Sequence, residues 1–188
     1  MLVQQFGAIY SVIARNVEGI THADSLAPAA GGGNTANWIL GHVVNVQNAV
    51  MSIIGAPPVW ESEQLERARF DHPIRAAGDA IDWDALVERF NASRDACLAA
   101  LASLTDEALA EEMPDAFVNH STRAAVLGIL VIHQCYHAGQ LGMSRAPRVS
   151  GPRFSPQARP RRSERCGSID FNGLNNIRLK SADLLRGH

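Results

Sequence analysis

Apolar residues recur at steps of three and four along four long segments of the chain. This spacing places them on one face of an α-helix, where they can be buried together. No segment shows the regular alternation of apolar and polar residues that a half-buried strand would have. The pattern therefore predicts four helices, which cover about residues 2–20, from Asn34 or Thr35 to about Ile54, from Asp82 to about Leu101, and from Ser121 or Thr122 to just before Pro147.

Residues that cap or break helices separate these segments. Asn34 or Thr35 can cap the second helix, and Asp82 can cap the third. Gly55 and the two prolines that follow it end the second helix. Thr105 indicates a further short, capped turn after the third helix.

Residues 56–81 form a long polar connection, with a short helix expected around Glu61–Ala68. A connection of this length in a compact domain is often a lid or the rim of a binding site. Three other histidines, His22, His72 and His120, fall in expected loops or at helix ends, and we expect them to be exposed.

Four helices that each bury one apolar face make an all-α four-helix bundle the expected fold. The chain has 188 residues, of which 46% are hydrophobic, enough for one domain with a substantial core. We expect the bundle to occupy residues 1–146. Residues 147–188 are rich in Pro and Arg and are expected to form a basic, poorly ordered tail.

The net charge of −2 hides an uneven distribution. Residues 146–188 contain nine basic and three acidic residues, a net charge of +6. Residues 1–145 contain eight basic and sixteen acidic residues, a net charge of −8. A basic tail could contact nucleic acid or an acidic partner. Its aromatic residues are only Phe154 and Phe171, which offer little surface for stacking on bases, so binding to nucleic acid is not expected.

Several other classes of protein are disfavoured. No run of about twenty apolar residues is present to span a membrane. The first twenty residues lack the basic start and cleavage site of a signal peptide. Cys97, Cys135 and Cys166 are irregularly spaced, so they indicate neither a disulfide framework nor a paired-cysteine zinc site. We therefore expect a cytoplasmic protein, with Cys97 as a small apolar residue of the core.

The spacing of the histidines is the most informative chemical feature. His133 and His137 are four residues apart, so at about 100° per residue their side chains lie about 40° apart on one helical face. That face is apolar and is expected to point into the bundle, whereas Cys135 falls on the opposite side. On the second helix, His42 also faces inward, and Trp38 precedes it by one turn and is expected to pack beside it.

These three histidines can converge if the second and fourth helices are neighbours. Buried imidazoles without partners are costly, and a divalent cation would remove that cost. Three neutral imidazoles suit Zn²⁺ or Ni²⁺, with Fe²⁺ and Mn²⁺ as alternatives, and they leave at least one coordination position open. A zinc peptidase is disfavoured, because Gln134 follows His133 where those enzymes carry Glu.

Two motifs together resemble the DinB-like superfamily: WILGHV at residues 38–43 and HQCYHAGQL at residues 133–141. The resemblance covers about residues 1–145 in helix order. It implies an up-down-down-up four-helix bundle, often dimeric, in which three histidines hold a divalent metal ion. By this resemblance the ligands are His42, His133 and His137.

The resemblance also implies a class of reaction, because some members are S-transferases or isomerases that use bacillithiol, mycothiol or glutathione. We therefore expect a metal-dependent thiol S-transferase, or a related hydrolase or isomerase, that forms a homodimer. Its small electrophilic substrate would lie under residues 56–81. Catalytic residues are not assigned: Tyr136 or Gln140 can contribute hydrogen bonds, although Tyr136 is expected to pack within the bundle. The alternative is a non-catalytic, stress-associated bundle in which the metal mainly links the helices.

Overall fold

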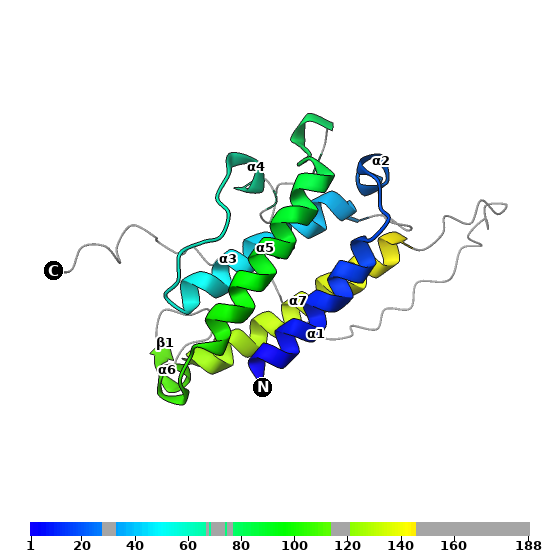
Figure 1. Cartoon of the computed structure of the whole chain (residues 1–188). Helices are drawn as coiled ribbons and strands as arrows, with labels where there is room; N and C mark the ends of the chain where they lie inside the picture. The colour runs from blue at the N-terminus through cyan, green and yellow to red at the C-terminus, as the bar shows by residue number, and fades with distance from the viewer. Residues whose placement is uncertain (28–32, 67, 69–73, 75–76, 114–120, 146–188) are drawn as a thin grey trace, which may run out of the picture.

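The computed structural model describes residues 1–27, 33–66, 68, 74, 77–113 and 121–145. Within this part the chain forms a bundle of four long helices, as the apolar spacing predicts (Figure 1). They are α1 (Leu2–Val17), α3 (Ala36–Ile53), α5 (Trp83–Ala102) and α7 (Arg123–Arg145). The predictions for His72, for His120, for a domain boundary at residue 146 and for a basic tail concern residues outside the described part.

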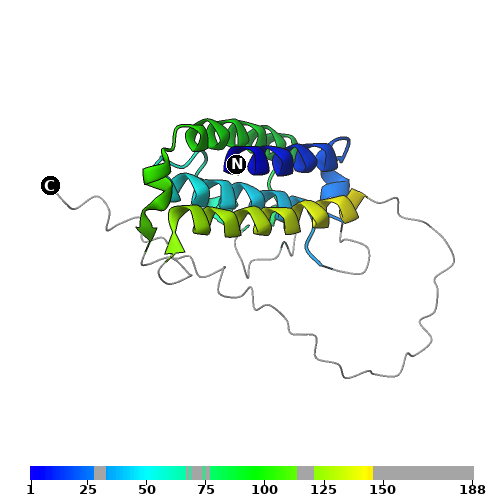
Figure 2. The same cartoon turned by 90° about the horizontal axis from the view of Figure 1, so that it is seen from below.

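The four helices have the up-down-down-up arrangement. Helices α1 and α7 run in one direction, whereas α3 and α5 run in the opposite direction (Figures 1 and 2). Both α1 and α3 pack against α5 and against α7. Helices α3 and α7, which carry the inward histidines, are therefore neighbours. None of the described helices has the length and apolar character needed to cross a membrane.

The helix ends follow the predicted caps. The hydroxyl of Thr35 accepts a hydrogen bond from the backbone N–H of Trp38, and the carboxylate of Asp82 accepts one from the backbone N–H of Ala85. Each bond satisfies a backbone donor that the first turn of a helix leaves free. Gly55 follows α3 with φ of 75°, a conformation that glycine adopts without steric cost. Local sequence thus accounts for where α3 and α5 begin and where α3 ends.

The core draws buried side chains from all four helices. Phe6 and Tyr10 of α1 are fully buried, and the ring of Tyr10 meets Phe90 of α5 edge-on at a centroid distance of 6.1 Å. Each such ring stabilises the fold by about 1.5–3 kcal/mol through the removal of apolar surface from water. Cys97 is fully buried as expected, and burial raises the pKa of its thiol to about 12.

The first helix is shorter than predicted. It ends at Val17, because Gly19 adopts φ of 74° and turns the chain into a second, short helix, α2 (His22–Ser25). Thr21 caps α2 in a reciprocal pair with Asp24. His22 is exposed and lies at a helix end, as predicted: it is the first residue of α2. Its Nδ1 accepts a hydrogen bond from the backbone N–H of Trp83.

Smaller elements join the long helices. The connection between α3 and α5 contains α4 (Glu63–Glu66), inside the range expected for a short helix, and a 3₁₀ turn at Ala77–Asp79. Thr105 caps α6 (Asp106–Ala110), as predicted. The strands β1 (Glu112–Met113) and β2 (Ser121–Thr122) pair antiparallel and were not predicted, since two residues are too few to show an alternating pattern.

Candidate metal centre

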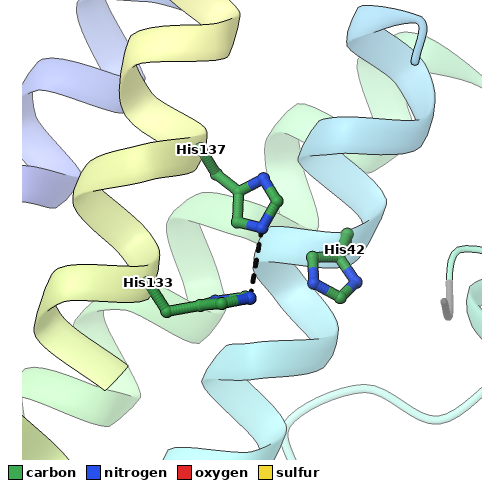
Figure 3. A group of neighbouring side chains, drawn as sticks. All are labelled: His42, His133 and His137. Carbon is green, nitrogen blue, oxygen red and sulfur yellow. Dashed lines mark hydrogen bonds between the residues drawn. The ribbon is translucent and has the colours of Figure 1, made fainter. Parts of the chain in front are cut away.

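The structure brings His42, His133 and His137 together between α3 and α7 (Figure 3). Each offers one ring nitrogen to the cluster, and these nitrogens all lie within 4.8 Å of one another. The ring centroid of His42 lies 5.3 Å from that of His133 and 4.7 Å from that of His137. The ring centroids of His133 and His137, both on α7, are 4.5 Å apart. The three residues singled out by their helical faces therefore form one site.

Packing of α3 holds His42 in place. Trp38, one turn earlier, lies with its ring stacked on the imidazole at 5.0 Å and an interplanar angle of 6°. Both side chains are buried, as expected. The flat indole therefore excludes water from one face of the His42 ring.

Burial keeps the three imidazoles neutral. It lowers the pKa of His42, and together with the electrostatic influence of His42 it lowers the pKa of His133 to about 4. Burial, the neighbouring rings of His42 and His133, and a smaller opposing effect of Gln140 leave the pKa of His137 at about 3. The direction follows from the cost of placing a cationic ring in a dry site beside other rings. At neutral pH all three are in the form that binds metal.

Hydrogen bonds define which nitrogen of two rings carries the proton. The Nδ1–H of His42 donates to the backbone carbonyl of Ala68 at 3.1 Å, since a carbonyl can only accept. The Nδ1–H of His137 donates to Oε1 of Gln140 at 2.8 Å. In both rings Nε2 then keeps its lone pair, which is the arrangement typical of a metal-binding histidine with a second partner.

The third ring lacks such a partner. Nδ1 of His133 is buried without a hydrogen-bond partner among the described residues, while its Nε2 lies 3.3 Å from Nε2 of His137. If the proton of His133 is on Nε2, it can be donated to Nε2 of His137, but the lone pair on Nδ1 of His133 then has no donor. If the proton is on Nδ1, the lone pairs on Nε2 of His133 and Nε2 of His137 face each other. A cation between the rings would be bound by all three Nε2 lone pairs. The donor set thus fits a divalent metal ion of the Zn²⁺, Ni²⁺, Fe²⁺ or Mn²⁺ type.

The structure corrects the prediction for Tyr136. Its side chain is 61% exposed and does not pack within the bundle, because its position on α7 faces solvent. The ring meets His137 edge-on at 5.1 Å, and its hydroxyl accepts a hydrogen bond from Nε2 of Gln140 at 2.9 Å. Gln140 thus links Tyr136 to His137. Cys135 is exposed on the far side of the helix, as predicted.

Several residues that position the site were missed by sequence reasoning. Three asparagines of α3 bind backbone groups of the connection that leads to α5: Asn37 binds Ile81, Asn45 binds Leu65, and Asn48 binds Val59 and Trp60. At about 100° per residue these positions fall within an arc of about 80°, with Gly41 inside it. The row of asparagines on one side of an otherwise apolar helix was the sequence signal that could have indicated these contacts.

A small pocket between α3 and the described part of this connection is lined by Asn37, Trp38, Gln64, Ala68, Ile74, Asp79 and Ile81. Its volume of about 10 Å³ is close to what one water molecule needs.

A four-helix bundle with a buried cluster of three histidines that can hold a metal ion defines the class of this protein. A family model described as the DinB superfamily matches residues 5–141, and the chain belongs to this superfamily. The fold is similar to that in a crystal structure of a conserved protein from Enterococcus faecalis, with a TM-score of 0.60 and 15% sequence identity. That match covers 77% of this chain and 92% of the other, and it concerns the fold alone. No curated protein matches the chain.

Proposed function

We propose that this protein binds a divalent metal ion, Zn²⁺ or Ni²⁺ in preference to Fe²⁺ or Mn²⁺, through His42, His133 and His137, and that it uses the ion in a thiol-transfer reaction. The observation that carries the proposal is the convergence of three neutral imidazoles from two helices. Three protein ligands leave at least one position open, as in catalytic sites, whereas structural zinc sites are closed by four.

The chemistry proposed is the transfer of a low-molecular-weight thiol to a small electrophile. A bound divalent ion lowers the pKa of a thiol at its open position and so favours the nucleophilic thiolate. The sulfur would form a bond to an electrophilic carbon in one of three ways. A halide leaves and the thiol proton passes to water, or an epoxide C–O bond opens and its oxygen takes up the proton, or a conjugated double bond takes up the proton on the carbon next to the one attacked. Ala68 and Gln140 orient two of the rings, and Trp38 keeps water from His42. A related hydrolase or isomerase would use the same site.

A second candidate function is structural. The histidines come from α3 and α7, so a bound ion would also join two neighbouring helices of the bundle. In that case the ion would stabilise the fold, and its open position would be filled by water without taking part in a reaction.

Metal content tests the first step of the proposal. The protein is purified without a metal-chelating column, and bound metal is measured by mass spectrometry beside His133→Ala and the control variant His22→Gln. His22 is exposed and lies in α2, so its loss should leave metal content unchanged. We expect about one ion per wild-type chain and much less in His133→Ala. Full occupancy in His133→Ala would contradict the ligand assignment.

Thiol binding separates the two candidate functions. The Co²⁺-substituted protein is titrated with bacillithiol, mycothiol and glutathione while its visible absorption spectrum is recorded. A transferase predicts that one of these thiols produces an intense sulfur-to-cobalt charge-transfer band, which the three histidine ligands alone cannot give. A spectrum unchanged by all three thiols would favour the structural ion.

A further inference from the structure

Gly41 lies in α3, directly beside the connection that runs from α3 to α5. A Cβ atom at this position would come within 2.7 Å of the Cβ of Ala68 and 3.5 Å of Cδ1 of Ile81. Carbon atoms pack best at about 3.5–4.0 Å, so the first approach is a clash. The Cβ of Ala68 is bonded to the backbone and cannot rotate away. Any side chain at Gly41 would therefore displace the connection.

The part of the connection that packs against Gly41 includes a hydrogen-bond partner of His42. The carbonyl of Ala68 accepts the Nδ1–H of His42 at 3.1 Å, and this bond comes from the connection, outside α3. One turn further along α3, Asn45 donates to the carbonyl of Leu65 at 2.7 Å. Ala68 itself closes a turn by donating its N–H to the carbonyl of Leu65. The position of the Ala68 carbonyl thus depends on how closely Leu65 and Ala68 rest on α3.

We infer that Gly41 is a positioning residue for the metal centre: its missing side chain lets the Ala68 carbonyl approach His42 and hold Nε2 toward His133 and His137. This inference rests on the proposed metal site. Glycine inside a helix is unfavourable relative to alanine, and the close approach supplies the physical reason for it here. Gly41 acts through Ala68 and touches none of the reacting groups.

The three histidines differ in the hydrogen-bond partner of their Nδ1 atoms. The hydrogen-bond partner of His137 is Gln140, a residue of its own helix, whereas the hydrogen-bond partner of His42 lies in the connection. His133 has no partner at Nδ1 among the described residues. A shift of the connection should therefore alter His42 and leave the two α7 rings in place.

The test compares Gly41→Ala with Gly128→Ala. Gly128 also lies inside a long helix, but a Cβ there meets no atom within 4 Å, so this control carries the same gain in helix propensity without a clash. Zn²⁺ affinity is measured by competition with a chromophoric chelator. We expect Gly41→Ala to bind Zn²⁺ about 10- to 100-fold more weakly, the usual cost of losing a partner of a ligand. Gly128→Ala should match the wild type.

A rescue variant makes the test specific. The double variant Gly41→Ala with Ala68→Gly moves the methyl group from the connection to the helix and should restore most of the affinity. Ala68→Val enlarges the contact from the other side, leaves the sequence of α3 intact, and should weaken binding like Gly41→Ala. Wild-type affinity in both Gly41→Ala and Ala68→Val would overturn the inference.

A second readout does not require metal. In the metal-free protein, ¹⁵N NMR of the His42 ring should show a proton on Nδ1 in the wild type and a mixture of tautomers in Gly41→Ala. If the wild type binds no metal but the tautomer changes in this way, the proposed function fails while the positioning role stands. If the wild type binds Zn²⁺ and neither affinity nor tautomer changes, the positioning role fails alone.

Discussion

The Nε2 atoms of His133 and His137 lie 3.3 Å apart on successive turns of α7. With Nδ1–H of His137 donated to Gln140, the shared space between these atoms can hold one proton or one cation. The approach of His42 from α3 adds a third lone pair to the same space. The contact between His133 and His137 therefore makes the site sensitive both to protonation and to metal.

The first prediction concerns pH. In the metal-free protein the pKa of His133 is about 4, below the ordinary value of 6.5 that applies to the unfolded chain. Below pH 6.5 the unfolded chain takes up a proton on His133 that the folded protein does not. The contribution of neutral His133 to the free energy of unfolding is therefore fully present above pH 6.5 and is lost as pH falls toward 4. Each pKa unit corresponds to about 1.4 kcal/mol. His137, with a pKa of about 3, extends the loss to lower pH.

Urea unfolding of chelator-treated protein between pH 8 and pH 4 measures this loss. Carboxyl groups also titrate in this range, so the informative quantity is the difference from His133→Gln, which should have a shallower dependence on pH. Parallel curves for the two proteins would show that His133 is not held neutral by the fold.

The second prediction concerns Gln140. Replacing it with leucine removes the acceptor for Nδ1–H of His137, and Zn²⁺ affinity should fall about 10- to 100-fold. Gln140→Glu keeps an acceptor oxygen and should retain affinity. Tyr136→Phe is the matched control: it removes only an exposed hydroxyl that Gln140 donates to, and its effect should stay below about threefold. Competition titration checks all three, and equal affinity for Gln140→Leu and the wild type would refute the role.

The third prediction concerns the hydroxyl of Tyr10. It is buried beside Gln47 but makes no well-formed hydrogen bond among the described residues, and burial raises its pKa well above the ordinary value. Tyr10→Phe should therefore leave the free energy of unfolding unchanged or raise it by about 1 kcal/mol. Tyr10→Ala should lower it by about 3–5 kcal/mol, because a cavity opens beside Phe90. Urea unfolding measures both; a large loss in Tyr10→Phe would show that the hydroxyl is satisfied in solution.

The fourth prediction concerns Asn37. Its side-chain amide is buried, accepts from the backbone N–H of Ile81 at 3.1 Å and donates to the carbonyl of Ile81 at 2.7 Å. Asn37→Ala leaves two buried backbone groups without this partner, and each should cost roughly 1–3 kcal/mol of unfolding free energy. Asn45→Ala removes a single, partly buried bond and should cost about 1 kcal/mol. Chemical denaturation compares the two, and an equal, small loss would contradict this ranking.

The sequence by itself determined the helices and the faces on which the histidines lie. Helix periodicity and caps are local: Thr35 and Asp82 start their helices through hydrogen bonds to residues three positions away. The same local geometry placed His133 and His137 together and Cys135 on the far side. The predicted end of α1 was wrong by about three residues. The sequence allows Gly19 either to continue the helix or to turn the chain, and only its backbone conformation in the structure shows which occurs.

The tertiary structure decided everything that depends on contacts between distant residues. Helical periodicity cannot say which helices are neighbours, so the meeting of His42 with the α7 pair required the packing of α3 on α7. It also cannot place Tyr136 in solvent or bring Ala68 to His42, since these depend on the packed neighbours and on the path of a connection. Spacing within one helix is set by the backbone, whereas the partners across the bundle are set by the free energy of the whole core.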